Sequence, residues 1–158
     1  EEAFAYCYSL TSVNIPESVT TIGYEAFESC DSLTSVNIPD SVKTIGDYAF
    51  FECDSLTSVN IPDSVTTIGN KAFTYCDSLT SVTIGNSVNT IGEEAFRYCN
   101  SLKYVYCKAT TPPALGGWYV FNNNVSGRRI IVPIGSGEAY KTAEYWSEYA
   151  DDIIEDEF

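Results

Sequence analysis

The chain repeats itself every 23 residues, and this periodicity constrains its fold more than any other feature of its 158 residues. Residues 10–32, 33–55, 56–78 and 79–101 are four full copies of one unit. Residues 1–9 hold the tail of an earlier copy, and residues 102–107 hold the start of a fifth. Because one unit cannot bury its apolar side chains alone, this period predicts a solenoid in which equivalent residues stack into ladders.

Each unit follows the pattern L-x-x-V-x-I-P-x-x-V-x-x-I-G-x-x-A-F-x-x-C. Its first part alternates apolar and polar residues, which predicts a strand that ends at proline because proline has no N–H to donate. A second extended segment, Ser-Val-x-Thr-Ile-Gly, also turns its Val and Ile inward. After the glycine, Ala, Phe and Cys stand at positions i, i+1 and i+4, which predicts a short helical turn.

This pattern resembles the BspA-type class of bacterial leucine-rich repeats, and the resemblance covers residues 1–107. It implies an α/β repeat fold: a right-handed, curved solenoid with a parallel sheet on the concave side and short helical turns on the convex side. That family consists largely of surface antigens and adhesins of host-associated bacteria. The resemblance therefore implies a binding role at the cell surface or outside the cell, and it carries no catalytic residues.

From Lys108 the period is lost, so we divide the chain into repeats at 1–107 and an α+β capping segment at 108–158. Residues 109–117 are rich in Pro and Gly and predict a loop, residues 130–133 a strand, and residues 153–154 a last strand. Ser136 is a suitable N-cap for a helix that extends to about Tyr149. The cap must cover the last coil, and we assign that role to Trp118, Val120, Phe121, Trp146 and Ile153. The alternative is that the two Trp and several Tyr form a platform on which sugars stack.

No comparable cap precedes the first unit. The chain opens within the second half of a unit, which leaves Leu10, Val13 and Ile15 on an uncapped edge. We expect upstream repeats to stabilise this edge, and we also expect it to be able to pair with a second chain.

The amino-acid composition argues against several classes of function. Twenty-two acidic and eight basic residues give a net charge of −14, which opposes binding to nucleic acid or anionic lipid. The chain has no His, which removes the usual general base, His-containing triads and His metal sites. It has no nucleotide-binding motif, no signal peptide and no apolar run long enough to span a bilayer. We therefore expect no enzymatic activity, no cofactor and no transmembrane segment.

Cysteines and carboxylates also form ladders. Cys7, Cys30, Cys53, Cys76 and Cys99 occupy one equivalent position, and parallel side chains rarely reach disulfide geometry, so we expect free thiols with a Cys99–Cys107 bridge as the open exception. Asp31, Asp54 and Asp77 form one acidic ladder, and Glu17, Asp40 and Asp63 form another. Turn residues of this kind normally bond nearby backbone N–H groups, and we favour that role over Ca²⁺ binding and expect no metal site.

The polar residues of each strand must point outward, because the apolar ones point inward. We predict a binding face made of Ser12, Asn14, Ser35, Asn37, Ser58, Asn60, Ser81, Thr83, Tyr104 and Tyr106. Tyr104 and Tyr106 are its expected anchors, and the nearby Lys103 and Lys108 suit an acidic partner. The expected partner is a host extracellular protein or glycan. Phe51, Tyr75 and Tyr98 could form a second patch on the convex side. The alternative function is a structural spacer that projects other domains from the cell, in which case the Ser and Asn ladders only satisfy one another.

Overall fold

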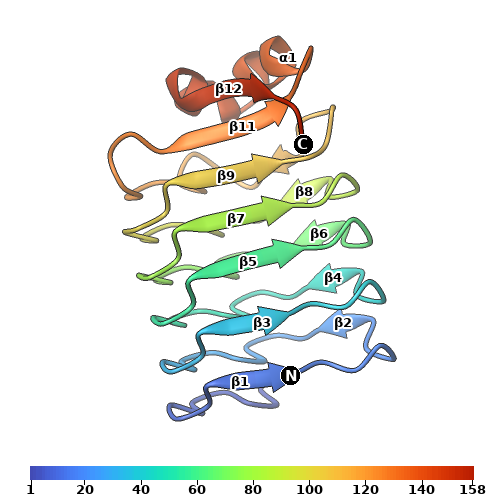
Figure 1. The fold of residues 1–158 in the computed structure, drawn as a ribbon, viewed down its shortest axis with the longest axis vertical. Helices are drawn as coiled ribbons and strands as arrows, with labels where there is room; N and C mark the ends of the chain where they lie inside the picture. The colour runs from blue at the N-terminus through green and yellow to red at the C-terminus, as the bar shows by residue number, and fades with distance from the viewer.

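The computed structural model describes residues 1–158 as a stack of flattened coils with one long strand per coil on the same side (Figure 1). These long strands are β1 (Ser12–Asn14), β3 (Ser35–Asn37), β5 (Ser58–Ile61), β7 (Ser81–Ile84), β9 (Tyr104–Cys107), β11 (Arg129–Pro133) and β12 (Ile153–Asp156). β1 pairs with β3, and β5, β7, β9, β11 and β12 form a five-stranded sheet. All pairs are parallel, as predicted. We call the outward surface of these seven strands the strand face.

The second extended segment of each unit forms a sheet of its own. It consists of the two-residue strands β2 (Thr21–Ile22), β4 (Thr44–Ile45), β6 (Thr67–Ile68), β8 (Thr90–Ile91) and β10 (Ala114–Leu115). Their pairing is parallel and in register, Thr on Thr and Ile on Ile in the repeats. The 23-residue spacing therefore sets the register of both sheets, because equivalent residues of successive units lie side by side.

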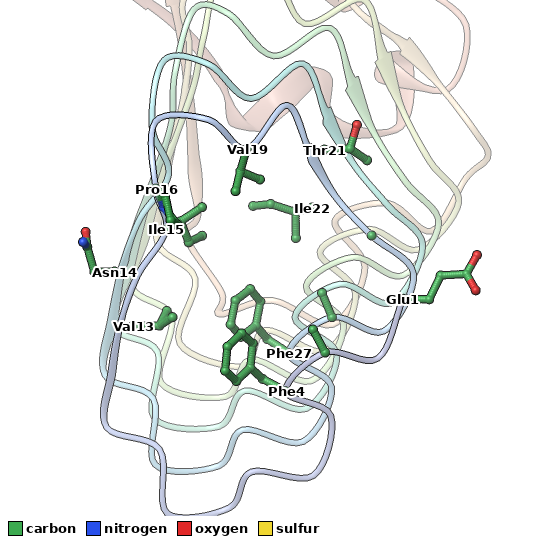
Figure 2. A pocket seen from close by; sticks show the side chains of 13 residues that line it. Glu1, Phe4, Val13, Asn14, Ile15, Pro16, Val19, Thr21, Ile22 and Phe27 are labelled. Carbon is green, nitrogen blue, oxygen red and sulfur yellow. The ribbon is translucent and has the colours of Figure 1, made fainter.

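The core lies between the two sheets and runs along the stack. In the view down the solenoid, Val13, Ile15 and Ile22 point into the interior while Asn14 points out (Figure 2). The Phe rings of successive coils are stacked with centroids 5.1 to 5.5 Å apart, from Phe4 through Phe27 to Phe121. Each interior ring therefore contacts one ring above and one below, which is the nearest-neighbour packing that a solenoid requires.

The first coil is less closely packed than the coils that follow it. A cavity of about 430 Å³ opens there and is lined by apolar side chains such as Val19 and Phe27 (Figure 2). Leu10 and Val13 are half-buried, and Phe4 is 41% exposed, whereas the equivalent Leu33 and Phe50 are fully buried.

The predicted helical turns are not helices. In every repeat, two residues that are not glycine have positive φ, such as Glu25 at 52° and Ser29 at 53°. The backbone between them forms consecutive hydrogen-bonded turns, while alternate N–H groups donate to the next coil: Glu25 to Asp47, and Phe27 to Ala49. An α-helix would bond its N–H groups to its own carbonyls after the first turn, so the segment gives up helical geometry in exchange for bonds between coils.

The glycine that ends each second strand permits this close stacking. A Cβ on Gly69 would lie 2.5 Å from the backbone carbon of Gly46 and 2.5 Å from the backbone nitrogen of Asp47. The short distance between successive coils therefore requires a residue without a side chain at this position.

The coiled path continues beyond residue 107, although the 23-residue spacing does not. β10 pairs with β8, and β11 pairs with β9. Phe121 adds another rung to the Phe ladder, 5.5 Å from Phe96 and 25 residues after it. The segment 109–117, expected to be a loop, thus contains a strand of the second sheet. The predicted strands at 130–133 and 153–154 are confirmed as β11 and β12.

The last coil is covered by the helix α1 (Gly137–Thr142) and the 3₁₀ helix η1 (Trp146–Asp152) (Figure 1). They replace the single helix expected up to Tyr149, because the backbone becomes extended at Ala143 (ψ 151°) and Tyr145 then takes a positive φ of 63°. Ser136 does not cap α1; its hydroxyl donates to the carbonyl of Pro133, and the N–H of Gly137 donates to Glu155 Oε1 at 2.6 Å. Neither helix has the length and apolar character needed to cross a membrane.

Four of the five predicted plug residues are buried, with exposed fractions of 4% or less: Val120, Phe121, Trp146 and Ile153. Trp146 also donates its Nε1–H to the carbonyl of Pro113 at 2.7 Å. Trp118 is the exception, since its side chain is 52% exposed and contacts Tyr145 edge to face. The core therefore takes up one of the two Trp residues, and the other remains on the surface.

Candidate functional site

The ten predicted outward residues form two rows across the strand face, and β11 extends each row by one residue that was not predicted, Arg129 or Ile131. One row is Ser12, Ser35, Ser58, Ser81, Tyr104 and Arg129, and the other is Asn14, Asn37, Asn60, Thr83, Tyr106 and Ile131. The residues of β1, β3 and β5 in these rows are exposed, while Ser81 and Thr83 are partly covered. This difference follows from the register, because Ser81 lies beside Tyr104 and Thr83 beside Tyr106.

The character of the strand face changes at β9. Tyr104 is 38% exposed, and its ring centroid lies 6.3 Å from that of Tyr106 with an interplanar angle of 27°. The two rings stand two residues apart on one strand and so point to the same side of the sheet. They replace the small polar side chains of the first four long strands with two amphipathic rings, which can pack against a partner and also hydrogen-bond to it.

Two cationic side chains flank Tyr104. Lys103 Nζ lies 5.5 Å from the centroid of the Tyr104 ring, and Arg129 is the register partner of Tyr104 on β11. Neither Lys103 nor Arg129 takes part in an ion pair, whereas Arg97 and Arg128 both do. Two cations without an ion pair therefore lie beside Tyr104, although the whole chain carries −14. Lys108, expected to belong here, lies 3.9 Å from Asp63 instead.

Two apolar residues beside Tyr106 were not among the predicted site residues. Ile131 is its register partner on β11 and is buried, and the ring of the exposed Phe158 contacts Tyr106 edge to face at 6.4 Å. The sequence indicated a strand at 130–133, but it gave no signal that this strand would pair with β9, because the spacing changes from 23 to 25 residues. We call Lys103, Tyr104, Tyr106 and Arg129 the β9 patch.

The three aromatic residues predicted for the convex side do meet. The ring of Tyr75 lies 5.7 Å from that of Phe51 and 4.7 Å from that of Tyr98. The planes of Tyr75 and Tyr98 differ by only 1°, so each ring covers a face of the other. Arg97 stacks on the ring of Tyr98, and its guanidinium is bound to Glu94 at 2.6 Å. Neighbouring rings thus cover much of the surface of Phe51, Tyr75 and Tyr98, unlike that of Tyr104 and Tyr106 on β9.

The six thiols are free, and the Cys99–Cys107 bridge left open by the sequence is absent. The four buried thiols of the Cys ladder each donate to the carbonyl of the Phe residue 26 positions earlier, for example Cys76 Sγ to Phe50 O at 3.2 Å and Cys99 Sγ to Phe73 O at 3.1 Å. Burial raises the pKa of Cys30 to about 11 and raises the pKa of Cys53 still further. These thiols therefore remain protonated near neutral pH and are poor nucleophiles.

Members of both acidic ladders accept hydrogen bonds from the next coil. Asp77 Oδ1 accepts from the side-chain amide of Asn100 at 2.8 Å, and Asp63 Oδ1 accepts the backbone N–H of Asn86 at 2.9 Å. The donors thus belong to the next coil. The prediction that these carboxylates bond N–H groups of their own turn was wrong. Burial, followed by the charges of Asp77 and Asp31, raises the pKa of Asp54. No group of three potential metal ligands gathers in the structure.

Parallel coils, two in-register sheets and stacked Phe, Cys and Gly ladders define a leucine-rich-repeat solenoid, and its most distinctive surface is the β9 patch. A family model for the BspA type leucine rich repeat region matches residues 1–130 in six copies. The chain belongs to this family, whose repeats are modules of surface-associated bacterial proteins. No curated protein matches the chain.

Solved structures of bacterial proteins resemble the chain. A leucine-rich repeat protein of T. pallidum is 41% identical with a TM-score of 0.65, over 66% of this chain and 49% of that one. The pneumococcal vaccine antigen PcpA is 20% identical with a TM-score of 0.67, over 99% and 38%. A leucine-rich repeat protein of Bacteroides ovatus is 24% identical with a TM-score of 0.50, over 84% and 51%. The chain thus spans about half or less of the first two proteins, and the last two likenesses concern the fold alone.

Proposed function

We propose that the chain is a non-catalytic binding module of a cell-surface or secreted bacterial protein, and that it meets a host extracellular protein or glycan on the strand face. The observation that carries this proposal is the β9 patch. Two tyrosine rings lie there between two cations that form no ion pair. Binding energy usually concentrates in a few aromatic and Arg side chains within a polar surround, which is the composition of this surface.

The proposed location has support from the family and from a structural neighbour. BspA-type repeats are associated with bacterial surfaces, and one protein with the same fold is described as a vaccine antigen. A non-catalytic role is supported by chemistry: the chain has no His, and burial raises the pKa of Cys53 and Cys107 and so keeps these thiols protonated.

The charge of the β9 patch favours an acidic partner surface. Lys103 and Arg129 attract carboxylates or sulfates, while the net charge of −14 repels anions from the rest of the chain. An acidic segment would therefore be directed towards β9. Such binding should weaken as salt screens the charges.

A binding screen of the purified chain against extracellular matrix proteins and glycans tests the proposal. For a captured ligand, the double variant Tyr104→Ser, Tyr106→Ser should weaken binding by more than about tenfold, equivalent to about 1.4 kcal/mol. The matched control is Tyr75→Ser, Tyr98→Ser, which removes the same number of rings from the convex side and should matter less. The opposite ranking would move the site to the convex side.

The uniform Ser and Asn rows of β1, β3 and β5 favour a second function, a spacer that projects other domains. These rows present the same small side chains in each coil and offer no anchor for a partner. If the screen captures no ligand at all, the spacer is the better account of the chain.

A further inference from the structure

A segment of the chain itself lies against the β9 patch. After β12 the chain leads back toward β11 and β9 (Figure 1), and the ring of Phe158 contacts the ring of Tyr106 edge to face, with centroids 6.4 Å apart and an angle of 75° between the planes. Phe158 is 57% exposed, so the contact holds it only loosely. Because edge-to-face packing needs a second aromatic ring, the contact shows that Tyr106 accepts an aromatic side chain.

The two tyrosine rings of the patch offer little open face for a sugar. Lys103 Nζ lies over the ring of Tyr104, 5.5 Å from its centroid, and the ring of Tyr106 is met by that of Phe158. A sugar stacks on a free ring face, whereas an aromatic side chain also packs edge to face. The geometry therefore favours a peptide over a glycan as the partner of these rings.

The cations of the patch are not used by this segment. Lys103 and Arg129 form no ion pair, and neither do Asp156 and Glu157, which directly precede the aromatic residue. Asp156 is held in β12 as the register partner of Pro133, and its Oδ1 accepts the backbone N–H of Glu157 at 2.8 Å. The segment thus occupies the aromatic half of the patch and leaves the cationic half open.

The two halves are spaced for one short extended peptide. Arg129 is the register partner of Tyr104, which stands two residues before Tyr106 on β9. With strands about 4.8 Å apart and a rise of about 3.3 Å per residue, the backbones of Arg129 and Tyr106 are about 8 Å apart. Since an extended peptide covers this distance in two or three residues, a peptide with its ring at Tyr106 can place a carboxylate at Arg129 or Lys103.

We propose that the β9 patch binds an acidic peptide segment that carries an aromatic side chain, and that Phe158 competes with this segment for Tyr106. The proposal rests on the proposed function and names its partner as a peptide. The partner's ring takes the place of Phe158, and its carboxylates pair with Lys103 and Arg129. Because the site is open only in chains whose Phe158 has left Tyr106, the tethered ring lowers the apparent affinity by that fraction.

Fluorescence anisotropy with a labelled, end-blocked peptide tests the proposal on the intact chain. The probe is Glu-Asp-Glu-Phe-Glu-Asp-Glu, which has carboxylates on both sides of one ring. We expect it to bind with a Kd below about 1 mM, and more weakly as salt is added. Two matched peptides, one with Ala in place of Phe and one with Gln and Asn in place of the acids, should each bind at least about fivefold more weakly.

Variants of the chain locate the peptide on the patch. The double variant Lys103→Gln, Arg129→Gln should weaken binding by more than about fivefold. Its control is Lys43→Gln, Lys141→Gln, which removes two other exposed lysines without an ion pair and should have little effect. Thermal unfolding shows that each variant is folded.

The competition by Phe158 has a test of its own. Phe158→Ala should tighten peptide binding by about threefold, because the competing ring is gone. The matched control is Ile134→Ala, since Ile134 is 64% exposed and lies outside the patch. Unchanged or weaker binding by Phe158→Ala would overturn the competition.

Three results would overturn the choice of partner. They are equal binding of the peptide without a ring, equal binding of the peptide without acids, and tighter binding of a chondroitin sulfate tetrasaccharide than of the probe. Absence of peptide binding would also overturn it. If a ligand from the screen still depended on Tyr104 and Tyr106, the proposed function would stand without this inference.

Discussion

Replacing Phe73 by alanine tests whether the Phe ladder holds the coils together. Phe73 is fully buried and stacks between Phe50 at 5.1 Å and Phe96 at 5.2 Å. Phe→Ala in a packed core costs about 3–5 kcal/mol, and a ring with two stacked neighbours on a rigid ladder belongs in the middle of that range. We expect Phe73→Ala to lower the free energy of unfolding by about 4 kcal/mol, a large part of the 5–15 kcal/mol typical of a domain.

Phe4→Ala is the matched control at the end of the same ladder. Phe4 is 41% exposed and stacks on one ring only, that of Phe27 at 5.3 Å. Its loss should cost about 1–2 kcal/mol, because less apolar surface and one contact fewer are lost. Urea unfolding followed by the fluorescence of the buried Trp146 measures both variants, with the slope m checked for two-state behaviour. Equal costs for the two variants would refute the argument that stability comes from stacked neighbours.

Three further predictions follow from the local geometry. In the native protein a thiol reagent should label Cys7, which is partly exposed, well before the five buried cysteines, and denaturation should release all six; fast labelling of more than one thiol would contradict this. The free energy of unfolding should fall above about pH 9, because burial raises the pKa of Cys53 and Cys76. In this pH range the thiols lose their protons in the unfolded chain and keep them in the folded chain. Each thiol therefore lowers the free energy of unfolding by about 1.4 kcal/mol per pH unit. Denaturation from pH 8 to 10.5 checks this, and Cys53→Ala should flatten the curve. Glu52→Gly should be more stable than Glu52→Ala by about 1 kcal/mol, because Glu52 has a φ of 58°; a helical turn would give the opposite order in calorimetry.

Much of the fold was predictable because its ladders repeat in the sequence. Alternation in Ser-Val-Asn-Ile assigns Val59 to the core and Asn60 to the surface, and the structure agrees. The spacing of Cys53 and Cys76 predicted free thiols, although not their bonds to carbonyl groups. These inferences succeed because in a solenoid each residue meets its own equivalent in the next coil.

The repeat pattern did not predict the backbone conformation of the turns between the second strand and the cysteine of each unit. Positive φ is ordinarily indicated by Gly or Asn, but here it falls on Glu25, Ser29, Lys71 and Tyr75. Only the hydrogen bonds to the next coil compensate for the strain, and they are a property of the stack that no single unit displays.

The cap was predicted in outline and missed in detail. Its strands and most of its plug residues carry an apolar pattern, whereas Trp118 differs from Trp146 only in its place in the fold. The rung at Phe121 was hidden by the change in spacing, and with it the fact that Val120-Phe121 takes the place of the Ala-Phe pair of each repeat. The β9 patch depends on the same register, because Arg129 comes beside Tyr104 only through it.

The central claim is that a partner binds on the strand face at β9, and oxidative footprinting of aromatic side chains tests it most directly. The chain is oxidised briefly with and without a captured ligand, and the modification of each tyrosine is measured by mass spectrometry. We predict that the ligand protects Tyr104 and Tyr106, while Tyr24 and Tyr75, which are of similar exposure to Tyr104, are modified as before. Protection of Tyr24 and Tyr75 with Tyr104 and Tyr106 unaffected would contradict the claim.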